Sequence, residues 1–141
     1  MMRGFLLDTC VISESTRSKA SAKVLAWLDV KPADSLYVSV LTLGEIEQGI
    51  AQVGVASQTR KLDAWLRDAI VPMFHSRILE IDLAVARRWG RLQGVARRIG
   101  KPLALIDSLL AATALEHDLT IVTRNVKDFA TLDVPIINPW S

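Results

Sequence analysis

Acidic residues stand in this chain at positions where a charge needs a partner. Asp8 follows directly on the apolar run Phe5-Leu6-Leu7. Asp107, if its segment is helical, has only apolar neighbours three and four positions away. Because taking a carboxylate out of water is costly, such residues need a partner, a metal ion or an exposed edge. If several of them converge, a hard divalent cation would relieve their repulsion and could activate water for hydrolysis.

Alternating apolar runs and longer helical patterns predict the elements that position these acids. Buried strands are expected at residues 4–7, 36–40, 78–81, 120–123 and 134–137. Helices are expected near residues 20–30, 42–53, 57–71, 83–99 and 103–118, with a short turn at 126–130 and a helix stop and restart at Gly100-Lys101-Pro102. Strands joined by helical crossovers favour a mostly parallel sheet between helices, an α/β sandwich.

Ligands of open α/β sheets gather outside the carboxyl ends of the strands. Asp8 follows the first strand, and Glu45 is expected in the first turn of the helix after the second. Asn125 and Asp128 follow the fourth strand. These polar positions are therefore expected to share one edge of the sheet, which Asp107 would join.

Each of these acids also has a purely structural interpretation. Thr42 and Glu45 have the spacing of a capping box. Asp8 could cap a following helical turn, and Asp128 could cap a turn as well. Asp107 could pair with a buried arginine.

Composition bounds the class of protein. A chain of 141 residues, 50% hydrophobic, fits one domain over 1–141. The formal net charge of +2 is only weak support for a nucleic-acid partner. Cys10 is the only cysteine and no secretory signal is evident, which favours a reducing compartment. Asp107 and Ser108 interrupt the richest apolar stretch, which makes it too short to span a membrane. We therefore expect a soluble protein of the cytoplasm.

The motifs LLDTCVISE, LTLGEIEQGI, ALIDSLLAATALEHDLTIVTRN and INPW resemble those of PIN-domain ribonucleases. They are most similar to the VapC-like and FitB-like toxins of bacterial toxin–antitoxin modules, and the resemblance spans nearly the whole chain. It implies a three-layer α/β sandwich with a mostly parallel sheet of about five strands. It also implies a Mg²⁺ or Mn²⁺ site and hydrolysis of RNA phosphodiester bonds to 5′-phosphate and 3′-hydroxyl ends.

The resemblance assigns roles to the acids. Asp8, Glu45 and Asp107 match the first three acidic positions of the family, with Asp8 and Asp107 expected as direct metal ligands and Glu45 as a ligand that also orients water. The fourth acidic position of the family has two candidates in this chain. Asn125 stands where many members have an aspartate, and Asp128 lies three residues later, where other members have an acidic residue. Either could complete the site.

Among the residues beside the acids, Cys10 departs from the family pattern, and Thr9 and Thr123 follow it. Cys10 stands where an asparagine is common, which removes a possible hydrogen bond to a carboxylate. Thr9 and Thr123 keep hydroxyls near the strand ends, and Arg124 and Lys127 are candidates for binding phosphate.

Other chemistries have weaker support. A metal-free ribonuclease usually uses a histidine as general base, and the chain has only His75 and His117. His117 is expected to cap its helix or to be solvated, and His75 is expected to follow a loop. No histidine is near Cys10 in sequence, so a cysteine nucleophile is disfavoured. A haloacid-dehalogenase-type phosphotransferase would need an aspartate where Cys10 stands, and a dinucleotide-binding enzyme a glycine-rich turn after the first strand.

The family resemblance also implies partners: a homodimer, and a small antitoxin, often carrying a DNA-binding portion, whose tail fills a groove of the toxin. DNA would be contacted only through that antitoxin, and an antitoxin arginine could replace the metal. A stripe of apolar residues could line the groove or pack into the core: Leu62, Trp65, Leu66, Ala69 and Ile70. The tryptophans at 27, 65 and 89 are expected in the core or an interface, and Trp140 is expected to tuck the C-terminus onto the body. Arg87, Arg91 and Arg98 are expected on a solvated helix face, with contact to RNA phosphate as the alternative.

The rival function is a PIN fold with an impaired site, motivated by Asn125 and Cys10. Such a protein would bind RNA or its antitoxin without cutting RNA.

Overall fold

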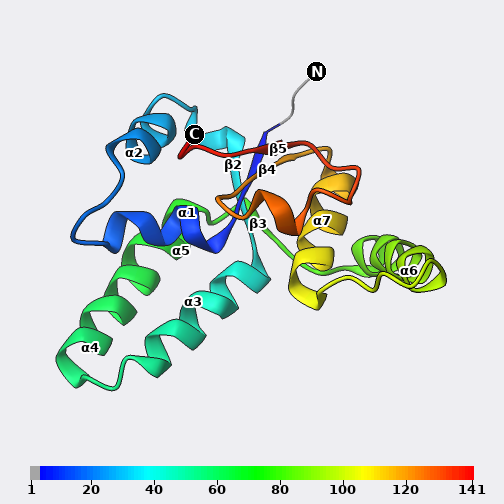
Figure 1. The fold of residues 1–141 in the computed structure, drawn as a ribbon. Coiled ribbons are helices and arrows are strands. Elements are labelled where there is room, and N and C mark those ends of the chain that lie inside the picture. The colour runs from blue at the N-terminus through cyan, green and yellow to red at the C-terminus, as the bar shows by residue number, and fades with distance from the viewer. Residues whose placement is uncertain (1–3) are drawn as a thin grey trace.

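The computed structural model describes residues 4–141 and contains a five-stranded sheet in the order β3-β2-β1-β4-β5 (Figure 1). Every neighbouring pair of these strands is parallel. The strands are β1 (Phe5–Leu7), β2 (Leu36–Ser39), β3 (Ile78–Leu79), β4 (Thr120–Val122) and β5 (Ile136–Ile137). All five predicted strands are confirmed, and each is shorter than the apolar run that predicted it.

Helices surround the sheet. They are α1 (Thr9–Ser13), α2 (Ala22–Asp29), α3 (Val40–Gln52), α4 (Ala56–Trp65), α5 (Val71–Met73), α6 (Leu83–Arg98) and α7 (Leu105–His117). Single turns are η1 (Glu14–Thr16), η2 (Ala33–Ser35), η3 (Leu66–Ile70) and η4 (Val126–Asp128), of which η3 is a π-helical turn that joins α4 to α5. The sequence predicts no helix at α1, η1 or η2, because segments this short show no helical period, and it indicates only that Asp8 could cap a following turn.

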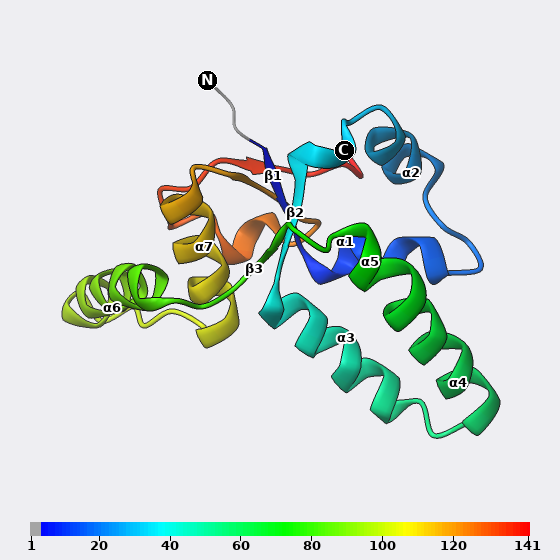
Figure 2. The ribbon, with the colours of Figure 1, turned by 180° about the vertical axis from the view of Figure 1, so that it is seen from behind.

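Two apolar cores lie on opposite faces of the sheet. Phe5 and Leu7 point into one core, and Leu6 between them points into the other, as the alternation of a strand requires. The first core takes residues from α1, α2, α3 and η3, and the second takes them from α7 and the segment after β4. Figures 1 and 2 show these two groups of helices on either side of the strands, with α7 between the sheet and α6. The predicted α/β sandwich is confirmed.

The tryptophans stabilise these layers. Trp27, Trp65 and Trp140 pack against the first core, and the Nε1–H of Trp89 donates to Ser108 Oγ on α7 at 2.9 Å. The predicted apolar stripe also belongs to this core: Leu66 and Ile70 are buried, Leu62 and Trp65 pack against them, and only Ala69 is exposed. The stripe therefore packs mainly within the chain itself.

The turn between α6 and α7 sets where α7 begins. Gly100 has a φ of +75°, Gly100 N–H donates to Arg97 O, and Lys101 N–H donates to Ala96 O. This is a Schellman C-cap, so the predicted stop at Gly100 is confirmed. Gln93, buried on α6, then fixes Leu103: its Nε2 donates to Leu103 O at 2.9 Å and its Oε1 accepts from Leu103 N–H at 2.8 Å.

No helix among residues 4–141 combines the length and the apolar composition needed to cross a bilayer.

Candidate active site

Asp8 leaves β1 at the carboxyl edge of the sheet and joins three elements. Its backbone N–H donates to Val122 O at 3.0 Å, continuing the pairing of β1 with β4. Its Oδ1 accepts from Thr9 N–H at 2.8 Å and caps α1, while its Oδ2 accepts from Thr123 Oγ1 at 2.7 Å. The predicted helix cap is therefore present, and only 9% of the residue is exposed. These hydrogen bonds orient the carboxylate of Asp8 but bring no positive charge to it.

Glu45 lies on α3, one turn later than the sequence suggested. The helix begins at Val40, and Ser39 caps it by accepting from Leu41 N–H at 3.0 Å. The interpretation of Thr42 and Glu45 as a capping box is therefore wrong, because the preceding strand ends earlier and Ser39 takes the cap. Glu45 Oε1 instead accepts from Thr9 Oγ1 at 2.6 Å, which connects α3 to α1.

Asp107 stands in the first turn of α7 and is half-buried. Its pKa is raised from 3.8 to about 6, chiefly by burial, and the negative charges of Asp128, Asp8 and Glu45 add to the shift in that order. These effects require the four carboxylates to lie within electrostatic reach of one another.

No cation compensates this cluster in the described part of the chain. Ion pairs among residues 4–141 join Arg17 to Glu14, Arg67 to Asp68 and Arg88 to Glu116, and none includes Asp8, Glu45, Asp107 or Asp128. The interpretation of Asp107 as the partner of a buried arginine is therefore wrong. The carboxylates repel one another at the edge of the sheet.

Asn125 and Asp128 lie at the two ends of the turn η4, after β4. Asn125 N–H donates to Thr123 Oγ1 at 3.0 Å, so Thr123 connects this turn to Asp8. The side chains of both residues are exposed, and that of Asn125 makes no capping hydrogen bond. Asp128 contributes charge to the cluster, whereas Asn125 can contribute only neutral oxygen or nitrogen.

Cys10 lies between two groups of the site. Its Sγ is 4.0 Å from Asp8 Oδ2 and 3.9 Å from Thr123 Oγ1. Burial is the main cause that raises the pKa of the thiol above 9.0, and the charge of Asp8 raises it further. A thiol held protonated in this way is a poor nucleophile. His75 precedes β3 and His117 ends α7, so both lie away from the carboxyl edge where the acids gather.

The donor set fits a hard divalent cation. No group of three or more histidine, cysteine or acidic side chains within residues 4–141 is already drawn together tightly enough to hold a metal. The carboxylates nevertheless share one edge, raise the pKa of Asp107 and have no internal cation. Carboxylate oxygens are the ligands that Mg²⁺ and Mn²⁺ prefer.

Sequence reasoning missed the residues of α6 that support Asp107. Gln93 holds Leu103 four residues before it, and Trp89 holds Ser108 immediately after it. One signal was available: Gln93 is a polar residue within the apolar stripe of its helix, and a buried amide there needs partners.

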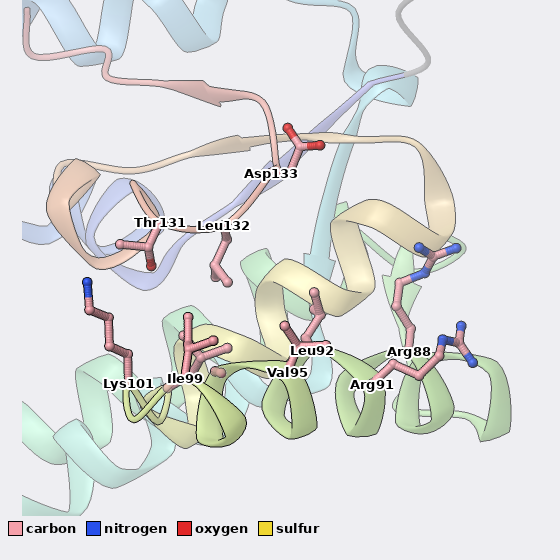
Figure 3. Close-up of a pocket in the computed structure, with 11 residues that line it drawn as sticks. Arg88, Arg91, Leu92, Val95, Ile99, Lys101, Thr131, Leu132 and Asp133 are labelled. Carbon is pink, nitrogen blue, oxygen red and sulfur yellow. The ribbon is translucent and has the colours of Figure 1, made fainter.

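A second feature is a hollow of about 400 Å³ between α6 and residues 131–133 (Figure 3). Leu92, Val95 and Ile99 face Leu132 across it, with Arg88 and Arg91 toward one end and Lys101 at the other. Val95 is 51% and Ile99 64% exposed, which is high for apolar residues. Arg87, Arg91 and Arg98 are all exposed, as predicted.

Comparisons with known proteins agree with this architecture. The model of the PIN domain family matches residues 5–134. The chain is 38% identical to "Toxin FitB" of Neisseria gonorrhoeae over 96% of this chain and 97% of that one, and 33% identical to "VapC ribonuclease Y4jK" of Sinorhizobium fredii over 96% of each. Its structure is similar to the crystal structure of FitAcB from Neisseria gonorrhoeae, with a TM-score of 0.91 and 38% identity over 96% of this chain and 98% of that one. A structure of FitAB bound to the IR36 DNA fragment aligns with a TM-score of 0.90 and 36% identity over 97% and 96%.

Proposed function

Since this chain belongs to the PIN domain family, we propose that it is a metal-dependent endoribonuclease and the toxin of a toxin–antitoxin pair, folded as one domain over residues 1–141 and acting in the cytoplasm. The observation that carries the proposal is the uncompensated cluster of Asp8, Glu45, Asp107 and Asp128. The names of its relatives, a toxin and a VapC ribonuclease, support the same function.

The chain's own residues prepare the site for hydrolysis. Asp8 and Asp107 would hold Mg²⁺ or Mn²⁺, and Glu45 would hold the attacking water. Asp128 and Asn125 would complete the metal site on its solvent-exposed side. When bound, such an ion supplies positive charge for the phosphate oxygens and lowers the pKa of a water. Thr123 and Thr9 restrict the side chains of Asp8 and Glu45 through their hydrogen bonds, so little reorganisation is needed.

The products follow from these groups. Neither histidine lies at the carboxyl edge, so no histidine is in place there as the base for attack by the RNA's own 2′-hydroxyl, and we assign the carboxylates to the metal and its water. Attack by water therefore leaves a 5′-phosphate and a 3′-hydroxyl.

The test is cleavage of RNA by the purified chain freed of any partner. We expect labelled RNA to be cut in Mg²⁺ or Mn²⁺ to products with 5′-phosphate ends, and cutting to stop when EDTA removes the ion. Cleavage that persists in EDTA, or products with a cyclic phosphate, would exclude this mechanism. RNA binding without cleavage in any of several RNA pools would instead support the impaired domain that Asn125 and Cys10 suggest.

An antitoxin is the proposed protein partner, because the similar FitAB structure is a complex bound to DNA. Any contact with DNA would be made by that partner. An arginine of the antitoxin placed among the four carboxylates would compensate their charge and exclude the metal. Co-purification with the product of the neighbouring reading frame, with cleavage suppressed in the complex, would support this partner.

A second copy of the chain is the proposed partner of the α6 hollow. Its apolar floor and the exposed Val95 and Ile99 would be covered in a homodimer. We expect light scattering to give the mass of a dimer for the native chain and of a monomer for Ile99→Glu. Val30→Glu, at a residue 75% exposed on the end of α2, is the matched control and should stay dimeric. A monomeric native chain, or a dimeric Ile99→Glu variant, would show that this face is not the interface.

A further inference from the structure

The last strands of the sheet bring two distant segments to the carboxyl edge. Val122 of β4 stands opposite Ile137 of β5, and Thr123 N–H donates to Ile137 O at 3.0 Å. The chain then continues into Arg124 on one side and Asn138-Pro139-Trp140 on the other. Figure 1 shows the C-terminus leaving β5 at this end of the sheet.

Trp140 is held in place at this edge. Its backbone N–H donates to Asn138 Oδ1 at 3.0 Å, and Ser141 N–H donates to Asn138 O at 3.2 Å, which closes a turn around Pro139. The indole ring is half-buried and packs against the core that contains Phe5 and Leu7. The ring is therefore a fixed surface.

The guanidinium of Arg124 lies over this ring, with Arg124 Cζ 5.2 Å from the ring centroid. A guanidinium over the face of a tryptophan is an attractive arrangement, and tryptophan is the best ring for it. Arg124 directly follows Thr123, whose hydroxyl donates to Asp8. Arg124 therefore directly follows, along the chain, a residue that contacts the acidic cluster.

Arg124 makes no ion pair with these acids in the described part of the chain. An arginine side chain that folded back onto several carboxylates would pair with one of them and cancel the negative charge that a metal needs. Stacking on Trp140 gives the guanidinium another position, while its donors remain exposed to solvent.

We propose that Trp140 is a positioning residue that holds Arg124 as a docking point for an RNA phosphate next to the one that is cleaved. The inference rests on the proposed function and deepens it. Guanidinium groups bind phosphate oxygens in a planar, two-point geometry, and the acids of the site repel RNA unless a cation is placed beside them. Arg124 binds the phosphate, and Trp140 acts through Arg124.

Cleavage kinetics test the proposal with Trp140→Leu, Trp140→Phe and Arg124→Gln. Arg124→Gln and Trp140→Leu should each raise KM by roughly tenfold, with kcat within about twofold of the native value. This pattern is expected when the lost contact binds the substrate and the transition state equally well. Trp140→Phe keeps an aromatic ring and should restore most of the affinity. Trp27→Leu is the matched control, because Trp27 also carries a cation, Lys31 Nζ at 5.0 Å, but its ring packs on Phe5. It should leave KM unchanged.

Binding of a fluorescein-labelled single-stranded RNA in EDTA, followed by anisotropy, tests the same step without catalysis. The slope of the association constant, log K against log salt, is negative, and Arg124→Gln and Trp140→Leu should both make it less negative, by about 0.7 for one lost phosphate contact. The double variant should bind as Arg124→Gln alone does, because both changes remove one contact. A merely structural role of Trp140 would leave the salt slope unchanged.

The outcomes separate this inference from the proposed function. The inference would be overturned if Trp140→Leu bound RNA with native affinity. It would also be overturned if the double variant lost as much binding free energy as the two single variants together. If Trp140→Leu does not fold, Trp140→Phe replaces it, and its smaller loss must disappear in the Arg124→Gln background. If the native chain cuts no RNA with any metal, the proposed nuclease fails, while the binding series still decides the role of Trp140.

Discussion

Asp107→Asn is expected to slow RNA cleavage by roughly 10²–10³-fold, the range seen when one electrostatic contact to the transition state is removed. Asparagine has the shape of aspartate but no negative charge, so it would hold a divalent cation poorly. Burial and three acidic neighbours also disfavour the charge of Asp107 in the folded chain and raise its pKa. Initial rates on one RNA at saturating Mg²⁺ give the measurement.

The same substitution should stabilise the metal-free chain, which distinguishes lost chemistry from lost folding. Its raised pKa shows that the Asp107 carboxylate opposes folding at neutral pH. Urea unfolding of Asp107→Asn should therefore occur at a higher midpoint than that of the native chain. Asp34→Asn, at an exposed residue before β2, is the control and should change neither the rate nor the midpoint. A variant that retains full activity would remove Asp107 from the proposed site, and a lower urea midpoint would contradict the predicted cost of its charge.

The fold was predictable because its elements are long or strongly apolar. The apolar runs located all five strands, and Gly100 marked the end of α6 correctly. The errors lie at helix starts that depend on one side chain: Asp8 caps the short helix α1, and α3 begins earlier than predicted because Ser39 caps it. Both caps are local hydrogen bonds that compete with other plausible caps nearby, such as Thr42.

The grouping of the acids could be predicted from the sequence, and their hydrogen bonds could not. The rule that ligands gather at the carboxyl edge placed Asp8, Glu45 and Asp128 together, and all three act on the pKa of Asp107, which the apolar neighbours on its own helix had singled out. The bond from Thr9 to Glu45 joins residues 36 apart, and that from Thr123 to Asp8 joins residues 115 apart. Such contacts depend on strand register, which no local pattern determines.

The structural and functional interpretations of Asp8 also turned out to be compatible. Sequence reasoning treated a helix cap and a place in the acidic cluster as alternatives. The two oxygens of the carboxylate have different partners: Oδ1 caps α1, and Oδ2 accepts from Thr123. A capped carboxylate keeps its full charge, so a cap at a strand end does not argue against a metal site.

Metal binding and pH should act together on the stability of this chain. Asp107 has a pKa of about 6 when folded and near 3.8 otherwise. Between these values the folded chain binds more protons than the unfolded chain, so the contribution of Asp107 to the free energy of unfolding falls as pH rises from about 4 to about 6. Above that window the metal-free chain carries the full cost of the charge. A divalent cation binds only the deprotonated cluster, so it should recover this cost at neutral pH and lose its effect in acid.

We therefore expect Mg²⁺, at roughly tenfold above its Kd, to raise the melting temperature by about 5 °C near neutral pH. Near pH 5, below the raised pKa of Asp107, the shift should largely vanish because the proton competes with the metal. Differential scanning calorimetry of the native chain and Asp107→Asn, with Mg²⁺ or EDTA at both pH values, gives the comparison. Asp107→Asn should show a small shift that does not depend on pH across this range. An equal Mg²⁺ effect at both pH values, or one retained in Asp107→Asn, would mean that the ion binds somewhere other than the cluster around Asp107.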